Sequence, residues 1–197
     1  MKTVLVICAV IYALYGQGSF SGSTGVIHEA NPDSFADQWI ADLDFLAGKL
    51  PKKHKNLFFQ LPESEFKNDI EILKKKVINL ENYEIIVGIM KILSKVGDSH
   101  TTAGIWRIKS FHYVPVGISL FSDGFFVTRA ERGRSDLIGD ELIRIKSTEI
   151  SEVVRRLEEV ISHENQAQVD KQVTWLMINA EVLKALGIAE SINQINS

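Results

Sequence analysis

The spacing of apolar residues changes from helical to strand-like across one short turn at 96–104, and this change constrains the fold more than any other feature of the sequence. Before the turn, apolar residues recur at intervals of three and four in three segments, as in amphipathic helices. After it, β-branched and aromatic residues crowd into runs at 113–121 and 124–130, separated by a turn signal at 122–124. We therefore expect an α+β fold, with an N-terminal three-helix bundle followed by a small sheet and C-terminal helices.

Each of the predicted helices has a start or stop signal. The first is expected to end at Pro51, because proline cannot continue a helix. The second begins after Pro62, and the third runs from about Glu81 to Lys95, where Gly97 follows as a C-terminal cap. Their apolar faces comprise Phe35, Trp39, Leu43, Leu46 and Leu50 in the first, Phe66, Ile70, Leu73 and Val77 in the second, and Tyr83, Ile86, Val87, Met90 and Leu93 in the third.

The sequence after the hairpin predicts one more strand and further helical stretches. Residues 142–145 are expected to form a short strand that ends in a turn at 146–147. The apolar spacing over 150–161 is helical again. The stretch 164–186 is expected to be mostly helical and to end at Gly187.

Charge and composition exclude two classes of protein. The formal net charge is −3, so the chain has no basic footprint for nucleic acid, and we expect no such partner. Charged clusters at 52–55 and 74–76 are interpreted as solvated faces, which places His54 in a charged loop. The 45% hydrophobic content is enough to build a core, so the chain is not a disordered protein.

The N-terminus has the features of a secretory signal peptide. Lys2 precedes an apolar run at 4–15, and small and polar residues follow at 16–23. The run is short for a membrane span, which needs about 20 residues. We expect 1–25 to be a signal peptide and the protein to be secreted or extracytoplasmic, with no stable membrane span after cleavage. The alternative is an uncleaved segment that tethers the protein to a membrane. Cys8, the only cysteine, lies in the apolar run, so the mature chain is expected to lack disulfides.

The turn between the helical and strand-rich parts carries Asp98, Ser99 and His100 side by side. A carboxylate, a hydroxyl and an imidazole can exchange or orient protons, so these residues form a candidate catalytic site. The same residue types are also common in ordinary turns, where Gly97 can cap the helix and the polar side chains bond to nearby backbone groups. The sequence leaves both interpretations open. It has no metal-ligand spacing and no glycine-rich phosphate loop, so we expect neither a metal nor a cofactor.

The strand-rich segment and the helix after it resemble a PDZ-like domain of the circularly permuted bacterial kind. The strongest likeness is the piece 137–145, Leu-Ile-Gly-Asp-Glu-Leu-Ile-Arg-Ile, although the next two residues, Lys-Ser, replace the Asn-Gly turn of that family. The resemblance implies a PDZ-like domain at 111–162, in which Val116, Gly117 and Ile118 receive a peptide carboxylate on backbone amides. In the alternative interpretation, Gly117 only relieves crowding in a strand.

A helical segment that ends in an Asp-x-His-Thr turn and precedes a PDZ-like domain resembles the front half of the tail-specific, or C-terminal-processing, serine peptidases. Matching motifs occur in order at 42–46, 52–58, 96–101 and 163–165. The resemblance to the tricorn-like branch implies a helical domain at 33–104, in which His100 is the catalytic base and Ser99 a supporting hydroxyl, next to Asp98. The nucleophile of that family lies in a further core. The helical segment 163–197 is expected to lead toward such a core, which is expected to be missing.

The function implied by this resemblance is that of a secreted, truncated peptidase homologue that binds peptides or protein C-termini and lacks the nucleophile. A partner chain or the missing catalytic domain would then complete it. One alternative is a non-catalytic interaction or inhibitory module that docks on a partner subunit. Another is a complete hydrolase that uses Ser99 and His100, although adjacent residues rarely place a serine oxygen in attack geometry on the neighbouring imidazole. Enzymatic activity is left open at this point.

Overall fold

The structure is a computed structural model that describes residues 35–105, 108 and 110–189. The predicted signal peptide, 1–25, lies outside these residues, and so does the end of the predicted C-terminal segment. Helices and strands together confirm the predicted α+β class. No helix in the described part of the chain is both long and apolar enough to cross a membrane.

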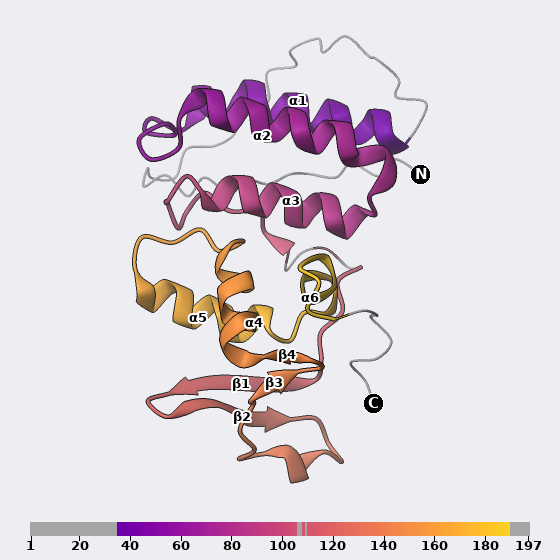
Figure 1. The fold of residues 1–197 in the computed structure, drawn as a ribbon, viewed down its shortest axis with the longest axis vertical. Coiled ribbons are helices and arrows are strands. Elements are labelled where there is room, and N and C mark those ends of the chain that lie inside the picture. Colours follow the sequence, from indigo (N-terminus) through magenta and orange to yellow (C-terminus); the bar gives the residue numbers. More distant parts are fainter. Residues whose placement is uncertain (1–34, 106–107, 109, 190–197) are drawn as a thin grey trace, which may run out of the picture.

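Three helices form one end of the molecule, as the apolar spacing predicts. In Figure 1, α1 and α2 lie side by side, and α3 lies between them and the rest of the chain. The bounds are α1 Phe35–Lys53, α2 Glu63–Lys76, a short 3₁₀ helix η1 Val77–Asn79, and α3 Asn82–Ser94. The predicted apolar faces of α1 and α2 are buried, except for Phe35 at the first residue of α1, which is 46% exposed.

The end of α1 differs from the prediction. Pro51 lies inside the last turn, and the helix continues to Lys53. Proline has a helical φ, and although it lacks the N–H that would bond to the carbonyl of Ala47 and its ring crowds that carbonyl, the helix continues for the last two residues of the turn. The backbone N–H of His54 then donates to the carbonyl of Leu50 at 2.9 Å, which completes the turn. The prediction that Pro51 stops the helix was wrong for this reason.

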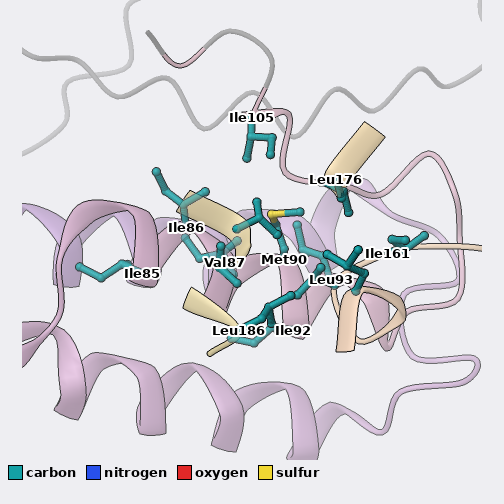
Figure 2. Close-up of a cluster of buried hydrophobic side chains, with 14 of the residues drawn as sticks. Ile85, Ile86, Val87, Met90, Ile92, Leu93, Ile105, Ile161, Leu176 and Leu186 are labelled. Carbon is teal, nitrogen blue, oxygen red and sulfur yellow. The ribbon is translucent and has the colours of Figure 1, made fainter. Parts of the chain in front are cut away.

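The third helix is the centre of the core. A capping box starts it, because the side chains of Glu81 and Glu84 each accept from the other residue's backbone N–H. Its buried side chains lie all round the helix and not only on one stripe. Figure 2 shows several of them against Ile105, Leu176 and other side chains from the second half of the chain. The buried core is therefore one cluster that includes residues from α1 through α6.

The predicted hairpin is confirmed. It consists of β1 (Val116–Phe121) and β2 (Gly124–Ala130), which pair antiparallel with a bulge between Gly117 and Ile118. The other edge of β2 bonds to the chain that follows the 3₁₀ helix η3 (Ser135–Leu137). Within that contact Val127 N–H donates to the Asp140 carbonyl at 3.0 Å. Hence β2 is flanked on both sides, and β1 is an edge strand in the described part of the chain.

A second, smaller hairpin follows at the predicted turn. It consists of β3 (Arg144–Ile145) and β4 (Thr148–Glu149). Lys146 takes a positive φ of 53°, the left-handed conformation for which Asn and Gly are better suited. The two-residue turn therefore forms although Lys-Ser replaces Asn-Gly.

Three helices follow the strands, α4 (Ile150–Glu158), α5 (Gln166–Leu176) and α6 (Ala180–Ala185). The prediction that 164–186 is mostly helical is confirmed, but two helices fill it, because the chain leaves α5 and starts α6 at a new cap. Asn165 caps α5 by accepting from Gln168 N–H, and Asn179 caps α6 in the same way by accepting from Val182 N–H. The helix predicted over 150–161 ends earlier, at Glu158.

Candidate functional site

The turn after α3 depends on a glycine. Gly97 has a φ of 70°, and a Cβ at this position would lie 2.2 Å from Oε1 of Gln60. An L-residue is strained at that φ, and the approach of Gln60 leaves no room for a side chain. Gly97 has the predicted left-handed conformation but lies two residues after Lys95, the C-cap of α3, and its N–H donates to the Ser94 carbonyl at 3.2 Å. Thr101 N–H closes the following turn on the carbonyl of Asp98 at 2.9 Å.

The Asp98 carboxylate is the hub of the turn. Its Oδ2 lies 2.9 Å from Nε2 of His54 and accepts from Thr101 Oγ1 at 2.8 Å. Its Oδ1 accepts from the backbone N–H of His100 at 2.9 Å and lies 3.3 Å from Nδ1 of the same residue. Partial burial favours the neutral form, but these contacts outweigh it, led by the His100 backbone N–H, and lower the pKa of Asp98 to about 2. Asp98 is therefore ionised at neutral pH.

The three predicted catalytic residues are brought together, but not as a relay. Ser99 Oγ lies 3.5 Å from Nδ1 of His100, the nitrogen that also faces Asp98. A serine–histidine–aspartate relay uses one ring nitrogen for each partner. With both contacts on Nδ1, Ser99 is not placed to pass a proton through the ring to Asp98. The side chain of His100 is 65% exposed. Its Nε2 has no hydrogen bond in the described part of the chain, and a hydroxyl other than Ser99 can approach it.

A fourth residue joins the turn from the loop before α5. Glu164 Oε1 accepts from Ser99 Oγ at 3.2 Å and from Ser99 N–H at 3.4 Å. A buried hydrogen bond from Ser162 Oγ to the Thr101 carbonyl, 2.7 Å long, ties the two segments together. As a result, one ligand atom each from Asp98, His100 and Glu164 lies within 4.8 Å of the others. We call these three residues the turn cluster.

Sequence reasoning missed two residues of this site. His54 was interpreted as part of a solvated face, yet its side chain is only 13% exposed and contacts Asp98. Glu164 comes from a distant loop, and no local pattern links it to the turn. Both residues lie in motifs that carry the family resemblance, 52–58 and 163–165. Those motifs were the available signal.

The remaining described histidines lie elsewhere. His112 Nδ1 lies 2.5 Å from Oε1 of Glu181, and the His112 backbone N–H donates to Oε2 at 2.7 Å. Glu181 is 2% exposed, so this pair fixes the chain before β1 to α6. His163 Nδ1 lies 2.9 Å from the carbonyl of Ile161, at the end of the segment that follows α4. Neither histidine belongs to the turn cluster.

The predicted peptide-binding residues line a hollow of about 320 Å³ between β1, the end of β2 and α5. Val116, Gly117 and Ile118 form one wall, and Arg129 of β2 and Trp175 of α5 contribute others. Helix α5 contacts β1 and runs alongside it in Figure 1. We call this feature the β1 hollow. It places side chains from three elements around the residues that the resemblance singles out.

The backbone of β1 presents polar groups on its outer edge. In β2, the Phe125 carbonyl accepts from Leu142 N–H, and Val127 also bonds on that side, so both residues face away from β1. Their partners in the register are Leu120 and Ile118, respectively. Residues of a non-hydrogen-bonded antiparallel pair point their N–H and C=O groups away from each other. Leu120 and Ile118 therefore direct theirs to the outer edge of β1.

The packing of the Arg129 side chain against β1 requires a glycine at position 117. A Cβ at this position would lie 2.8 Å from Nε and 3.1 Å from Cβ of Arg129. The absence of a side chain lets Arg129 cross the strand and reach the hollow. Gly117 therefore relieves crowding in the strand, which is one of its two interpretations. It also lines the hollow, as the other interpretation, a peptide-binding residue, requires.

The turn cluster and the β1 hollow are two separate features at opposite ends of α5. Glu164 precedes the helix and Trp175 lies in its last turn, so about 15 Å of helix separates them. Comparisons of the chain with family models, with curated proteins and with solved structures gave no significant match.

Proposed function

We propose that this protein binds peptides, or the C-terminal ends of other proteins, along β1. The observation that carries the proposal is the placement of Val116, Gly117 and Ile118 in the β1 hollow, beside an edge strand with outward backbone groups. An extended peptide can add to such an edge through main-chain hydrogen bonds while a neighbouring hollow takes one of its side chains. The resemblance to PDZ-like domains predicts the same kind of ligand.

The walls of the hollow suit the end of a chain. Trp175 and Ile118 supply apolar surface for a terminal side chain, and the guanidinium of Arg129 supplies a positive charge for a free carboxylate. Arginine can hold a carboxylate with two parallel hydrogen bonds. The expected ligand is therefore an extended peptide with an apolar last residue and a free C-terminus.

The test is titration calorimetry of the chain with short peptides that have either free or amidated C-termini. Leu120→Pro removes one outward N–H of β1 and keeps the pairing with β2, because proline is tolerated on an edge strand where its nitrogen faces outward. Leu120→Ala is the matched control, since it shortens the same side chain and keeps the N–H. We expect Leu120→Pro to weaken binding about fivefold or more, and Leu120→Ala to weaken it less.

A second variant tests recognition of the carboxylate. Arg129→Gln removes the charge in the hollow and should reduce the preference for free over amidated peptides by about tenfold. Arg132→Gln, in the exposed loop after β2, is the control and should leave that preference unchanged. Equal affinity of the wild type for free and amidated peptides would contradict the proposal for C-termini. Equal binding by the two Leu120 variants would contradict addition to the β1 edge.

A further inference from the structure

We propose that the turn cluster of Asp98, His100 and Glu164 binds a divalent transition-metal ion of the Zn²⁺ class. Each residue offers one ligand atom, a carboxylate oxygen from Asp98 and from Glu164 and a ring nitrogen from His100, and these three atoms lie within 4.8 Å of one another. This site is independent of the peptide site, because it lies at the other end of α5. One imidazole nitrogen and two carboxylate oxygens form the ligand set.

The spacing of these atoms fits a metal ion. Zn²⁺ binds nitrogen and oxygen ligands at about 2.0–2.2 Å, which in a tetrahedral site puts neighbouring ligand atoms about 3.3 Å apart. Asp98 Oδ1 and His100 Nδ1 are already 3.3 Å apart. Glu164 is exposed and its ligand atom lies within 4.8 Å of the other two, so binding of an ion requires only a small movement of this side chain. Three protein ligands leave the fourth position to water.

The charges at the cluster also favour a cation. Two carboxylates, those of Asp98 and Glu164, meet at the cluster with ligand atoms within 4.8 Å of each other. In the described part of the chain, no lysine or arginine forms an ion pair with either residue. The donors that Glu164 does meet, the hydroxyl and the N–H of Ser99, are neutral. A divalent ion would therefore neutralise two carboxylates that otherwise repel each other.

Surrounding hydrogen bonds hold one ligand in place. His54 and Thr101 both engage Oδ2 of Asp98, which leaves Oδ1 turned toward His100. Partners of this kind orient metal-binding carboxylates in known sites. The buried hydrogen bond from Ser162 to the Thr101 carbonyl fixes the loop that carries Glu164 against the turn. The two segments that supply ligands are thus joined before an ion binds.

The ligand set selects the class of ion. Imidazole nitrogen suits Zn²⁺ and its transition-metal neighbours, whereas Mg²⁺ and Ca²⁺ prefer oxygen ligands alone. We therefore expect saturable binding of Zn²⁺, with a stoichiometry of one, and much weaker binding of Mg²⁺. A nonspecific acidic surface has no histidine ligand, so it would not bind Zn²⁺ much more tightly than Mg²⁺. This order of affinity therefore distinguishes the proposed site from such a surface.

The experiment is titration calorimetry of the full chain with Zn²⁺ after treatment with a chelator. His100→Ala and Glu164→Gln each remove one ligand and should weaken binding about tenfold or more. Glu63→Gln, an exposed carboxylate at the start of α2, is the matched control for Glu164→Gln and should change nothing.

Circular dichroism of each variant shows whether it is folded, and none of these substitutions removes a buried side chain. Absence of saturable Zn²⁺ binding by the wild type would overturn the proposal. So would full affinity in His100→Ala or Glu164→Gln, because the ion would then bind elsewhere. Equal loss in Glu63→Gln would mean that the binding is a diffuse surface effect, and this result too would overturn it.

Discussion

His54 Nε2 lies 2.9 Å from Asp98 Oδ2, and this contact joins the end of α1 to the turn after α3. The ring of His54 is largely buried, and its Nδ1 has no hydrogen-bond partner in the described part of the chain. A buried polar atom without a partner has a cost in stability. The contact with an ionised carboxylate acts against that cost and stabilises the histidine at this position.

Removal of His54 should therefore destabilise the protein. We expect His54→Ala to lower the free energy of unfolding by about 2 kcal/mol, because a hydrogen bond to a charged group is lost in a partly buried site. Urea unfolding followed by circular dichroism measures the change. Lys53→Ala, at the exposed neighbouring residue, is the control and should stay within about 0.5 kcal/mol of the wild type. Equal small effects in both variants would show that the contact adds no stability.

Protonation of Asp98 should make the free energy of unfolding depend on pH in the acid range. Its pKa is about 2 in the folded protein and about 4 when unfolded, so the unfolded chain takes up the proton first as the pH falls. The resulting stability, about 1–2 kcal/mol after allowance for solvent screening, is fully present above about pH 5. It is lost progressively as the pH falls from about 4 toward 2. Urea unfolding with a chelator present, at several pH values, should show a shallower acid dependence for Asp98→Asn than for the wild type.

The glycine at the end of α3 should resist substitution. Gly97→Ala forces an L-residue into a φ of 70° and against Gln60, so we expect a loss of about 1–3 kcal/mol. Gly48→Ala is the matched control inside α1, where a new Cβ meets no atom within 4 Å. There the change should stabilise the protein by about 0.5–1 kcal/mol, because alanine favours helix. Thermal unfolding of the two variants should shift in opposite directions.

Because α3 packs in one core with both halves of the chain, we expect the two halves to unfold together. Leu93 is fully buried among side chains from both halves, so Leu93→Ala should cost about 2–5 kcal/mol. Ile78→Ala, at a side chain that is 77% exposed, should change stability by less than about 0.5 kcal/mol. Hydrogen exchange should show faster opening of both α2 and α5 in Leu93→Ala. Faster exchange in α2 alone would mean that the halves unfold independently.

Local patterns predicted most of the fold but only part of the site. The apolar spacing indicated α1, α2 and α3, and the turn at 122–124 indicated the hairpin, because both signals depend on neighbours in the chain. The break before α6 was missed because Asn179 acts as a cap only once the chain has turned. Asp98, Ser99 and His100 could be predicted because they are adjacent. His54 and Glu164 reach them only through packing of distant segments.

The β1 hollow shows the same division between local and distant signals. A family resemblance pointed to Val116, Gly117 and Ile118, and all three line it. Arg129 and Trp175 could not be placed beside them from sequence, because the first depends on the strand register and the second on how α5 docks. The charge and the aromatic surface of the hollow therefore come from the tertiary structure.

The outer edge of β1 also bears on how copies of the chain meet at high concentration. Unpaired strand edges can template pairing with another chain, and aggregation follows when such an edge is flat and apolar. Leu120 and Phe121, at the far end of the strand, are 38% and 52% exposed. The bulge between Gly117 and Ile118 increases the local twist at the near end of the strand only. Self-association through this edge should therefore begin at the tip of the hairpin, and a peptide bound along β1 as proposed should block it.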